Sequence, residues 1–395
     1  MILLQINVTA NWGSTGKIAE DIGKLAIKNG WESWIAYGRG NPNSESNLIR
    51  IGNDFDMRLH GIGTRLFDNH GLMSKSVTKD FIKKIKGLKP DIIHLHNIHG
   101  YFINYKILFD YLKEWGGPVV WTLHDCWPFT GHCAYYDYVG CSKWQNECMN
   151  CPQLRSFPSS LWKDRSYNNF QDKKRAFCGH PNITFVPVSE WLRNELSKSF
   201  LKDYPAVTIH NGIDIDIFHP IEDMSQNSDK KLILGVASVW DKRKGLEEFV
   251  KLRDKLPEDY EILLIGLSKD QISALPKGIT GIRRTENIEE LVRYYNKADV
   301  FVNPTLEDNF PTTNLEALAC GTPVITYNTG GSPEAVDKNT GFIIPYQNAD
   351  MLAEGIVDIC ENRPFDASDC RERTILYYDK KKVYDNYIKL YDKIR

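Results

Sequence analysis

The feature that most constrains the fold is an alternation of short apolar segments with helical ones, which occurs twice along the chain. Apolar segments suited to buried strands recur between segments with helical spacing. In the second half they lie at 232–238, 261–266, 279–284, 298–302, 323–327 and 341–345. In the first half they lie at 1–8, 31–38, 90–97, 119–125, 183–189 and 205–212. Such alternation predicts parallel sheets with right-handed crossovers, and therefore two α/β domains in tandem.

Length and composition limit the class of protein. A chain of 395 residues exceeds one core of ordinary size, and the polar segment that follows Pro220 is typical of a linker. The apolar content of 42% and charged content of 25% are usual for a soluble protein, and a net charge of −2 argues against nucleic acid as a partner. No apolar run approaches the roughly 18 residues of a spanning helix. The apolar N-terminus is predicted to be a first strand and not a signal peptide, so we expect the chain in the cytoplasm.

A candidate ligand site lies between residues 298 and 334. The apolar segment 298–302 leads into a polar loop and then a helix, where Pro311 suits the first turn and Thr313 with Glu316 matches a capping box. Loops at the carboxyl ends of parallel strands bind ligands, and helix N-termini attract phosphate. Asp308 and Glu316 add carboxylates that can accept hydrogen bonds from hydroxyl groups. A loop and helix with these groups suit a nucleotide sugar. Alternatively, Glu316 only caps the helix and Asp308 is a solvated loop acid.

Two further features lie at the expected ligand edge of the first domain. A glycine turn, with Gly13 and Gly16, connects the first strand to a helix. It is not a Walker A loop, because the glycine spacing differs and Ile18 stands where a hydroxyl residue is needed. His124 and Asp125 end the segment 119–125. Alternatively, the glycines only form a tight turn, and His124 is a structural histidine.

The cysteines form a local cluster. Of nine cysteines, five lie between Cys126 and Cys151, which argues against a secreted disulfide framework. Cys133, Cys141, Cys148 and Cys151 could bind Zn²⁺ tetrahedrally and fold an otherwise unsupported loop. Reduced buried thiols, or a disulfide or cluster, remain alternatives.

A lysine-rich helix is predicted between residues 74 and 88. Its lysines lie opposite an apolar side that includes Phe81 and Ile85. A solvated helix face is one interpretation, and contact with an anionic membrane surface is the other.

Two stretches carry a resemblance to a known family. Residues 294–345, with Asp308 and Glu316 separated by seven residues and followed by A-L-A-C-G-T-P-V, resemble the acid-x7-Glu donor motif of retaining GT-B glycosyltransferases of family 4. Residues 205–218 resemble the N-G-x-D of that family. The resemblance implies two Rossmann-like parallel-sheet domains facing across a cleft, with a C-terminal helix crossing back. On this basis we expect an acceptor-side domain at 1–212 with a Cys-rich insert at 126–151, a linker at 213–230, a nucleotide-sugar domain at 231–375 and a returning helix at 376–395.

The resemblance also implies roles for individual residues. Lys244, with Arg243, is expected to pair with the donor diphosphate. Glu316 is expected to bind the ribose, and Asp308 or its neighbour Glu307 to hold the sugar. His124 is expected to contact the donor sugar, since T-L-H-D resembles the family's cleft histidine. The residues expected to bind the donor are Gly13, Gly16, Arg243, Lys244, Glu307, Asp308, Asn309, Phe310, Pro311, Thr312 and Glu316.

The expected activity is transfer of a sugar from a UDP- or GDP-sugar to a saccharide or lipid-linked saccharide, with retention. The chain has no D-x-D of the kind that carries Mg²⁺, so we expect protein cations and helix ends, and not a catalytic metal, to stabilise the leaving group. The segment 121–133 resembles enzymes of bacterial exopolysaccharide or capsule synthesis, which implies that setting and contact with the cytoplasmic membrane. One alternative is a nucleotide-sugar epimerase or hydrolase that uses Asp91, His94 and His124. The other is a non-catalytic, zinc-stabilised sugar-binding protein.

Overall fold

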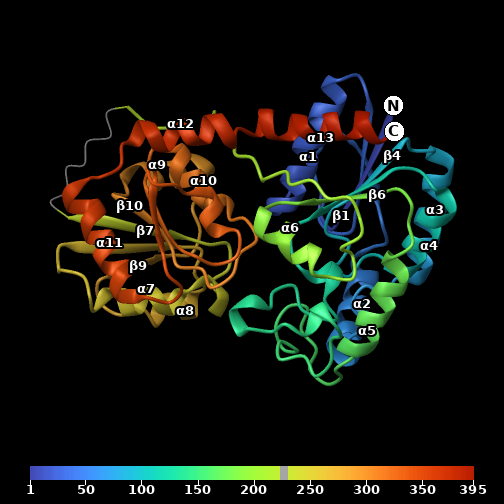
Figure 1. Cartoon of the computed structure of the whole chain (residues 1–395), viewed down its shortest axis with the longest axis horizontal. Helices are drawn as coiled ribbons and strands as arrows, with labels where there is room; N and C mark the ends of the chain where they lie inside the picture. Colours follow the sequence, from blue (N-terminus) through green and yellow to red (C-terminus); the bar gives the residue numbers. More distant parts are fainter. Residues whose placement is uncertain (223–229) are drawn as a thin grey trace. The chain divides into compact units, whose positions relative to one another are not determined.

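The computed structural model describes residues 1–222 and 230–395, which form two compact units. Unit 1 contains Met1–Ile209 and Tyr384–Arg395, and unit 2 contains His210–Val383. Each unit is built on one six-stranded sheet covered by helices (Figure 1). The described part of the predicted linker 213–230 belongs to unit 2, and residues 223–229 lie outside the described residues.

The sheet of unit 1 has the strand order β3-β2-β1-β4-β5-β6, and its pairings are parallel. Its strands are β1 (Ile2–Asn7), β2 (Glu32–Tyr37), β3 (Asn47–Arg50), β4 (Ile92–Leu95), β5 (Val119–Leu123) and β6 (Ile183–Pro187). Its helices are α1 (Gly13–Lys28), α2 (Asp54–Phe67), α3 (Lys75–Leu88), α4 (Tyr105–Trp115), α5 (Ser166–Phe177) and α6 (Glu190–Ser197). The central strands are apolar on both faces and almost fully buried, as in other parallel sheets.

One predicted strand of unit 1 is wrong. Residues 205–212 do not form a sheet strand, although Val207 and Ile209 donate backbone hydrogen bonds to β6 and one bridge joins Ala206 to Phe185. The ladder stops because Pro187, at the end of β6, has no N–H group to donate. The sixth strand is β3, whose four residues, N-L-I-R, are too few to show an apolar pattern.

The sheet of unit 2 has the order β12-β11-β10-β7-β8-β9, and its pairings are also parallel. All six strands lie where the sequence predicts them: β7 (Lys231–Val236), β8 (Tyr260–Ile265), β9 (Ile279–Ile282), β10 (Val300–Asn303), β11 (Val324–Tyr327) and β12 (Gly341–Ile344). The helices are α7 (Leu246–Arg253), α8 (Lys269–Ser273), α9 (Ile288–Lys297), α10 (Thr312–Ala319), α11 (Ala349–Asn362) and α12 (Ala367–Tyr377).

The strand order sets the ligand edge of each sheet. In unit 1 the chain turns from β1 outward to β3 and then returns to place β4 on the other side of β1. In unit 2 the corresponding strands are β7 and β10. Ligands of open α/β sheets bind outside the carboxyl ends of the strands at this reversal. The loops after β1 and β4, and those after β7 and β10, are therefore the places to look for a site.

The C-terminal helical segment divides into α12 and α13 (Lys380–Ile394), and from Tyr384 onward it belongs to unit 1. The Tyr391 hydroxyl lies 2.6 Å from Nδ1 of His94, and the Tyr387 hydroxyl 3.1 Å from that of Thr122. Both tyrosine rings are buried, so α13 is part of the core of unit 1. Within the described residues, we find no helix whose length and apolarity would let it cross a membrane.

The N-G-x-D segment also has a structural role within unit 2. A Cβ on Gly212 would lie 2.5 Å from Cα of Lys380, so only glycine allows the two backbones to approach. Asp214 forms an ion pair of 2.8 Å with the Lys380 side chain.

Candidate functional site

Three loops of unit 2 meet at the carboxyl ends of β7, β10 and β11. The N–H of Leu306 donates to the carbonyl of Arg243 at 2.7 Å, which joins the loops after β10 and β7. The N–H of Gly331 donates to the carbonyl of Asp308 at 2.8 Å, which joins the loops after β11 and β10. The structure therefore brings Arg243 and Lys244 together with Asp308 at the strand reversal.

The centre of this group is an ion pair between Lys244 and Asp308. The Lys244 Nζ hydrogen-bonds to Oδ2 of Asp308, and Nη1 of Arg243 lies 3.7 Å from the same oxygen. These three side chains are only 11–20% exposed. Burial alone would raise the pKa of the Asp308 carboxyl, but the charges of Lys244 and Arg243 outweigh it, and the pKa is lowered. Asp308 is therefore ionised at neutral pH and shares two cations.

Two glycines allow the loops to pack this closely. A Cβ on Gly330 would lie 2.1 Å from the carbonyl oxygen of Asp308, and a Cβ on Gly245 would lie 2.2 Å from that of Pro304. Both residues have positive φ angles, +55° and +77°, which other residues rarely adopt. The site depends on both glycines for its backbone geometry.

The structure distinguishes between the two adjacent acids. The Glu307 side chain is fully buried, whereas the carboxylate of Asp308 retains partial exposure. The next residues, Asn309 and Phe310, are buried, and Nδ2 of Asn211 donates to the Phe310 carbonyl at 3.2 Å. Of the two acids, Asp308 is the one that a ligand can reach.

Helix α10 differs from its predicted N-terminus. It begins at Thr312, with Pro311 in extended conformation at the N-cap, and no side chain caps it. The predicted Thr313–Glu316 capping box is therefore wrong. Oε2 of Glu316 instead accepts a hydrogen bond of 2.7 Å from the Tyr295 hydroxyl. Glu316 remains partly exposed.

In unit 1, the predicted glycine turn begins α1 at the carboxyl end of β1. Gly13 starts the helix with a φ of +67°, and Gly13 and Ser14 are exposed. A Cβ on Gly16 would lie 2.7 Å from Oγ1 of Thr9, so the loop folds tightly over the strand end. The first backbone N–H groups of α1 have no partner within the helix, which suits them to bind an anion.

His124 lies at the carboxyl end of β5 with its ring partly exposed. Its Nε2 lies 3.2 Å from Nδ1 of His96, and Nε2 of His96 lies 3.0 Å from Oε1 of Gln5. Burial lowers the pKa of His124 to about 4. The ring is therefore neutral at pH 7, and it can donate or accept one hydrogen bond without carrying charge.

A pocket of about 240 Å³ adjoins these residues, and it includes residues that the sequence did not single out. It is lined by Val8, Arg39, Asn97, His99, Gly100, Tyr101, Asp125, Tyr135 and Phe157. Nε2 of His99 lies 2.8 Å from Oδ2 of Asp125, whose other oxygen accepts from the Trp127 N–H at 3.0 Å. Burial would raise the pKa of Asp125, but the charge and hydrogen bond of His99 outweigh it and the pKa is lowered. Asp125, which follows β5, is the residue of this pocket that the sequence placed at the ligand edge.

The acid/base group of the epimerase alternative is not assembled. Asp91 precedes β4 and accepts a hydrogen bond from the N–H of Ile2, at the amino end of the sheet. His124 follows β5, at the carboxyl end. His94 is fully buried between Thr122 and Tyr391. These three residues cannot act on one substrate atom.

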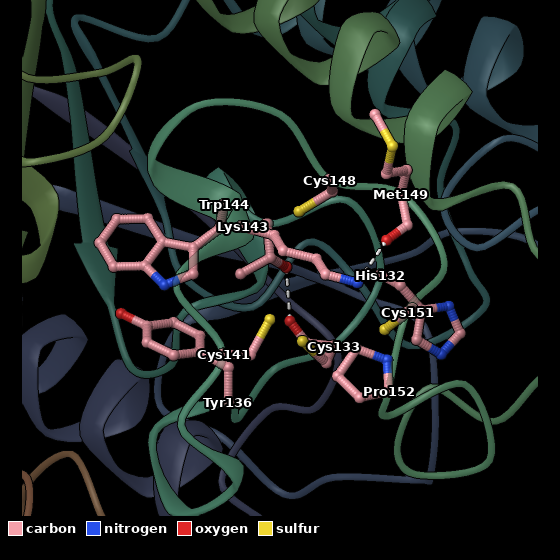
Figure 2. Close-up of a pocket in the computed structure, with 11 residues that line it drawn as sticks. His132, Cys133, Tyr136, Cys141, Lys143, Trp144, Cys148, Met149, Cys151 and Pro152 are labelled. Atoms are coloured by element: carbon pink, nitrogen blue, oxygen red, sulfur yellow. Dashed lines mark hydrogen bonds between the residues drawn. The ribbon is translucent and has the colours of Figure 1, made fainter.

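The four cysteines of the predicted metal site all line one small pocket in the segment between β5 and α5 (Figure 2). They come together although seven, six and two residues separate them along the chain.

The fold and the sites define a glycosyltransferase of the two-domain GT-B class, and comparison with known families agrees. The description "Glycosyltransferase Family 4" matches residues 16–217, and "Glycosyl transferases group 1" matches residues 230–362. The chain belongs to this family.

Individual relatives are similar over most of the chain. It is 24% identical, over 90% of both chains, to WcaC of Escherichia coli K12, whose name assigns it provisionally to colanic acid biosynthesis. It is 26% identical, over 53% of this chain and 60% of the relative, to an N,N'-diacetylbacillosaminyl-diphospho-undecaprenol α-1,3-N-acetylgalactosaminyltransferase of Campylobacter jejuni. Among solved structures, sucrose-phosphate synthase of Thermosynechococcus elongatus has a TM-score of 0.72 at 18% identity, covering 100% of this chain and 98% of that one. Anabaena HepE with UDP and glucose has a TM-score of 0.68 at 13% identity, covering 100% of both chains.

Proposed function

We propose that this chain transfers a sugar from a nucleoside-diphosphate sugar to a saccharide acceptor, with retention of configuration and without a catalytic metal. The observation that carries the proposal is the buried group of Arg243, Lys244 and Asp308 at the strand reversal of unit 2. Two cations beside the N-terminus of α10 form a site for a diphosphate. The HepE structures hold UDP or UDP-glucose, which supports a nucleotide-sugar donor here.

The roles of these residues follow from the charge that develops on the diphosphate leaving group. As the bond from the anomeric carbon to the diphosphate lengthens, negative charge grows on the leaving oxygen and positive charge on the sugar ring. Lys244 and Arg243 stabilise the leaving group as its charge develops, which lowers the barrier. Glu316 accepts hydrogen bonds from the ribose hydroxyls, and Asp308 accepts them from the sugar.

Donor binding involves an exchange of partners for Lys244. Without donor, its Nζ hydrogen-bonds to Asp308. The diphosphate takes over the ammonium group, and the carboxylate of Asp308 turns to the sugar hydroxyls. The ion pair thus keeps a largely buried cation paired in the absence of ligand.

Retention is supported by the family to which the chain belongs, and we propose that the acceptor attacks the sugar on the face that the diphosphate leaves. The neutral ring of His124 contacts the donor sugar, and it adds no positive charge next to an oxocarbenium-like ring. The pocket of about 240 Å³ in unit 1 takes the acceptor. In that pocket the ionised Asp125 accepts the proton of the attacking hydroxyl.

We further propose that the acceptor is lipid-linked and that unit 1 meets an anionic membrane surface. Helix α2 exposes Phe55, Leu59 and Ile62 at a helical spacing, with the exposed Arg58 between them. The apolar residues of α3, by contrast, are largely buried, and Lys83 and Lys86 of that helix are engaged in ion pairs. The undecaprenol-linked substrate named for the Campylobacter relative supports this class of acceptor.

The test of the whole proposal begins with a thermal-shift screen of UDP- and GDP-sugars, because the donor is the ligand that the site predicts. The stabilising donor is then supplied with an isotope label, together with undecaprenyl-diphosphate-linked sugars, and the product is examined by NMR. An α-linked product from an α-linked donor, with a rate unchanged by added Mg²⁺, is the expected result. Free, inverted sugar would support the epimerase alternative. An inverted linkage, or a requirement for Mg²⁺, would refute retention or metal independence respectively.

The membrane contact has its own test. Sedimentation with anionic vesicles should fall strongly when Phe55 and Ile62 are changed to serine. Removal of the exposed Lys79 of α3 serves as the matched change in charge alone. Equal sedimentation of the F55S/I62S variant would refute the role of α2.

A further inference from the structure

We propose that unit 1 holds one structural Zn²⁺ ion, bound by the thiolates of Cys133, Cys141, Cys148 and Cys151. The four cysteines line a single pocket, and their side chains enter it from different turns of the same loop (Figure 2). The pocket encloses about 10 Å³, which is close to the volume of one water molecule and too small for an organic ligand. An ion is the ligand of appropriate size, and four sulfurs are the donor set that Zn²⁺ takes in structural sites.

Hydrogen bonds already reach three of the four sulfurs. The N–H of Gly131 donates to Sγ of Cys148 at 3.2 Å, and the Cys133 and Cys151 side chains hydrogen-bond to each other. A Cβ on Gly131 would lie 2.2 Å from the Ser166 carbonyl and 2.6 Å from Cβ of Cys148, so glycine is needed for this approach. N–H groups that donate to sulfur are the outer partners expected around bound thiolates.

A second observation points to a metal independently of the cysteines. His132 lines the same pocket, and its Nδ1 lies 2.7 Å from Oδ1 of the fully buried Asp68. Within the described part of the chain, its Nε2 is buried without a hydrogen-bond partner. A carboxylate on one imidazole nitrogen fixes the tautomer and leaves the other nitrogen as a lone-pair donor, an arrangement typical of histidines at metal sites. The ring is thus positioned beside the thiols as an additional donor.

The charge of the surroundings also fits an anionic centre. Lys173 is fully buried on α5, where its Nζ donates to the carbonyls of Trp127 and Thr130 at 2.6 and 3.0 Å. Thr130 also lines the pocket of the four cysteines, so the ammonium group of Lys173 lies next to that pocket. A buried cation requires nearby negative charge, and a zinc ion with four thiolates carries a net charge of −2.

The loop has little regular secondary structure, although buried rings such as Trp127, Phe129 and Trp144 help to pack it. Between β5 and α5, its described residues contain only three single-turn helices: η1 (Trp127–Phe129), η2 (Asp137–Val139) and η3 (Lys143–Gln145). Irregular segments of this length are uncommon in compact domains, and a metal crosslink supplies the missing constraint. The loop carries Tyr135 and Phe157, which line the larger pocket of unit 1, so zinc would also maintain that pocket.

The sulfurs must close around the ion. Among the described residues, no three His, Cys, Asp or Glu side chains already form a group that could hold a metal. We propose that the cysteine side chains rotate between staggered positions to bring the sulfurs around the ion. Metal binding and ordering of such a loop are commonly coupled.

The first experiment measures zinc in the full chain, purified in reducing buffer without a polyhistidine tag or chelator. We expect about one equivalent of zinc per chain. Titration of the native protein with a mercurial reagent should release zinc in step with modification of four thiols. This measurement needs no variant, so a folding defect cannot obscure it. A wild-type chain that lacks zinc after expression and reconstitution with Zn²⁺ would overturn the proposal, as would a Cys133–Cys151 disulfide that persists in reducing buffer.

Variants then assign the ligands. C133S and C148S should each lower the zinc content at least tenfold. The matched control is C178S, since Cys178 is a half-buried thiol of unit 1 outside the pocket, and it should retain one equivalent. If H132Q loses zinc and C141S retains it, the site is supported with Nε2 of His132 as a ligand in place of the Cys141 sulfur. Zinc retained by C133S, C141S and C148S alike would refute it. Because the readout is metal content, failure of this proposal is distinguishable from failure of the proposed transferase activity.

Discussion

Replacing Lys244 with methionine should impair both stability and catalysis, but for different reasons. Methionine keeps most of the side-chain length and removes the charge. The loss leaves the carboxylate of Asp308, 14% exposed, with Arg243 at 3.7 Å as its remaining cation. Exposed ion pairs contribute up to about 1 kcal/mol, and breaking a fully buried pair costs about 3–5 kcal/mol. For this partly buried pair we expect a loss of about 2 kcal/mol in the free energy of unfolding at pH 7.

The sign of the pH dependence follows from Asp308. Its pKa is lowered in the folded chain, so ionisation stabilises the fold above the unfolded pKa of about 3.9 and this contribution is lost as pH falls through the folded pKa. The difference between wild type and K244M should therefore be largest at neutral pH and shrink below about pH 4. Urea unfolding followed by circular dichroism at several pH values measures it.

Catalysis should respond separately. Loss of one group that stabilises developing negative charge typically lowers kcat by about 100- to 1,000-fold, and we expect that range for K244M with the preferred donor. The double variant K244M/D308N should regain part of the lost stability, because the carboxylate left without Lys244 is removed, but it should not regain activity. Activity of K244M within about threefold of wild type would show that Lys244 does not act on the diphosphate. Unchanged stability at pH 7 would show that the ion pair is not formed.

Three further predictions concern other parts of the site and the fold. E316A should raise the KM for the donor by about 10- to 100-fold, because charged hydrogen bonds to the ribose are lost. Y295F removes only the 2.7 Å hydrogen bond to Glu316, so it should change the KM by less than about fivefold. Equal effects of the two variants would refute ribose binding. G330A should abolish stabilisation by the donor in a thermal-shift assay, because its Cβ would lie 2.1 Å from the Asp308 carbonyl oxygen. The control is G30A, which also has a positive φ, +77°, but no atom within 4 Å of the added Cβ, and it should only lower the free energy of unfolding by about 1 kcal/mol. Acidification should destabilise the chain, because burial lowers the pKa of His180 to about 4 and stability therefore rises with pH between about 4 and 6.5. H180Q should reduce the slope of the unfolding free energy against pH by up to about 1.4 kcal/mol per pH unit. An unchanged slope would refute the buried neutral ring.

The parts of the fold that could be predicted are the segments whose own residue pattern indicates whether they are buried. The six strands of unit 2 are apolar on both faces, so the prediction required no knowledge of their neighbours. Strand β3 was missed because its four residues have polar ends, and it pairs only because β2 presents a free edge. The segment 205–212 has the strand pattern but meets Pro187, a distant residue that stops the ladder.

The closeness of Arg243, Lys244 and Asp308 could be predicted because these residues lie in two short loops that follow predicted strands. Lys244 and Asp308 are 64 residues apart, and parallel-sheet topology alone places their loops together. The capping box failed because Pro311 takes the N-cap position, which places Thr313 inside the first turn of the helix, where it cannot cap it. The unit 1 pocket could not be predicted, since residues from Val8 to Phe157 converge there through tertiary packing.

The two units have the same topology but offer opposite chemistry at their strand reversals, and the proposed reaction accounts for the difference. Unit 2 places two cations around one carboxylate, which suits a ligand whose leaving group becomes more negative as it reacts. Unit 1 instead places the neutral ring of His124 and the ionised Asp125 at this edge, where an acceptor hydroxyl must lose a proton and the sugar carries positive charge. A cation in place of His124 would oppose the charge on the sugar. Under the proposed reaction, the burial that keeps this ring neutral would therefore serve catalysis as well as packing.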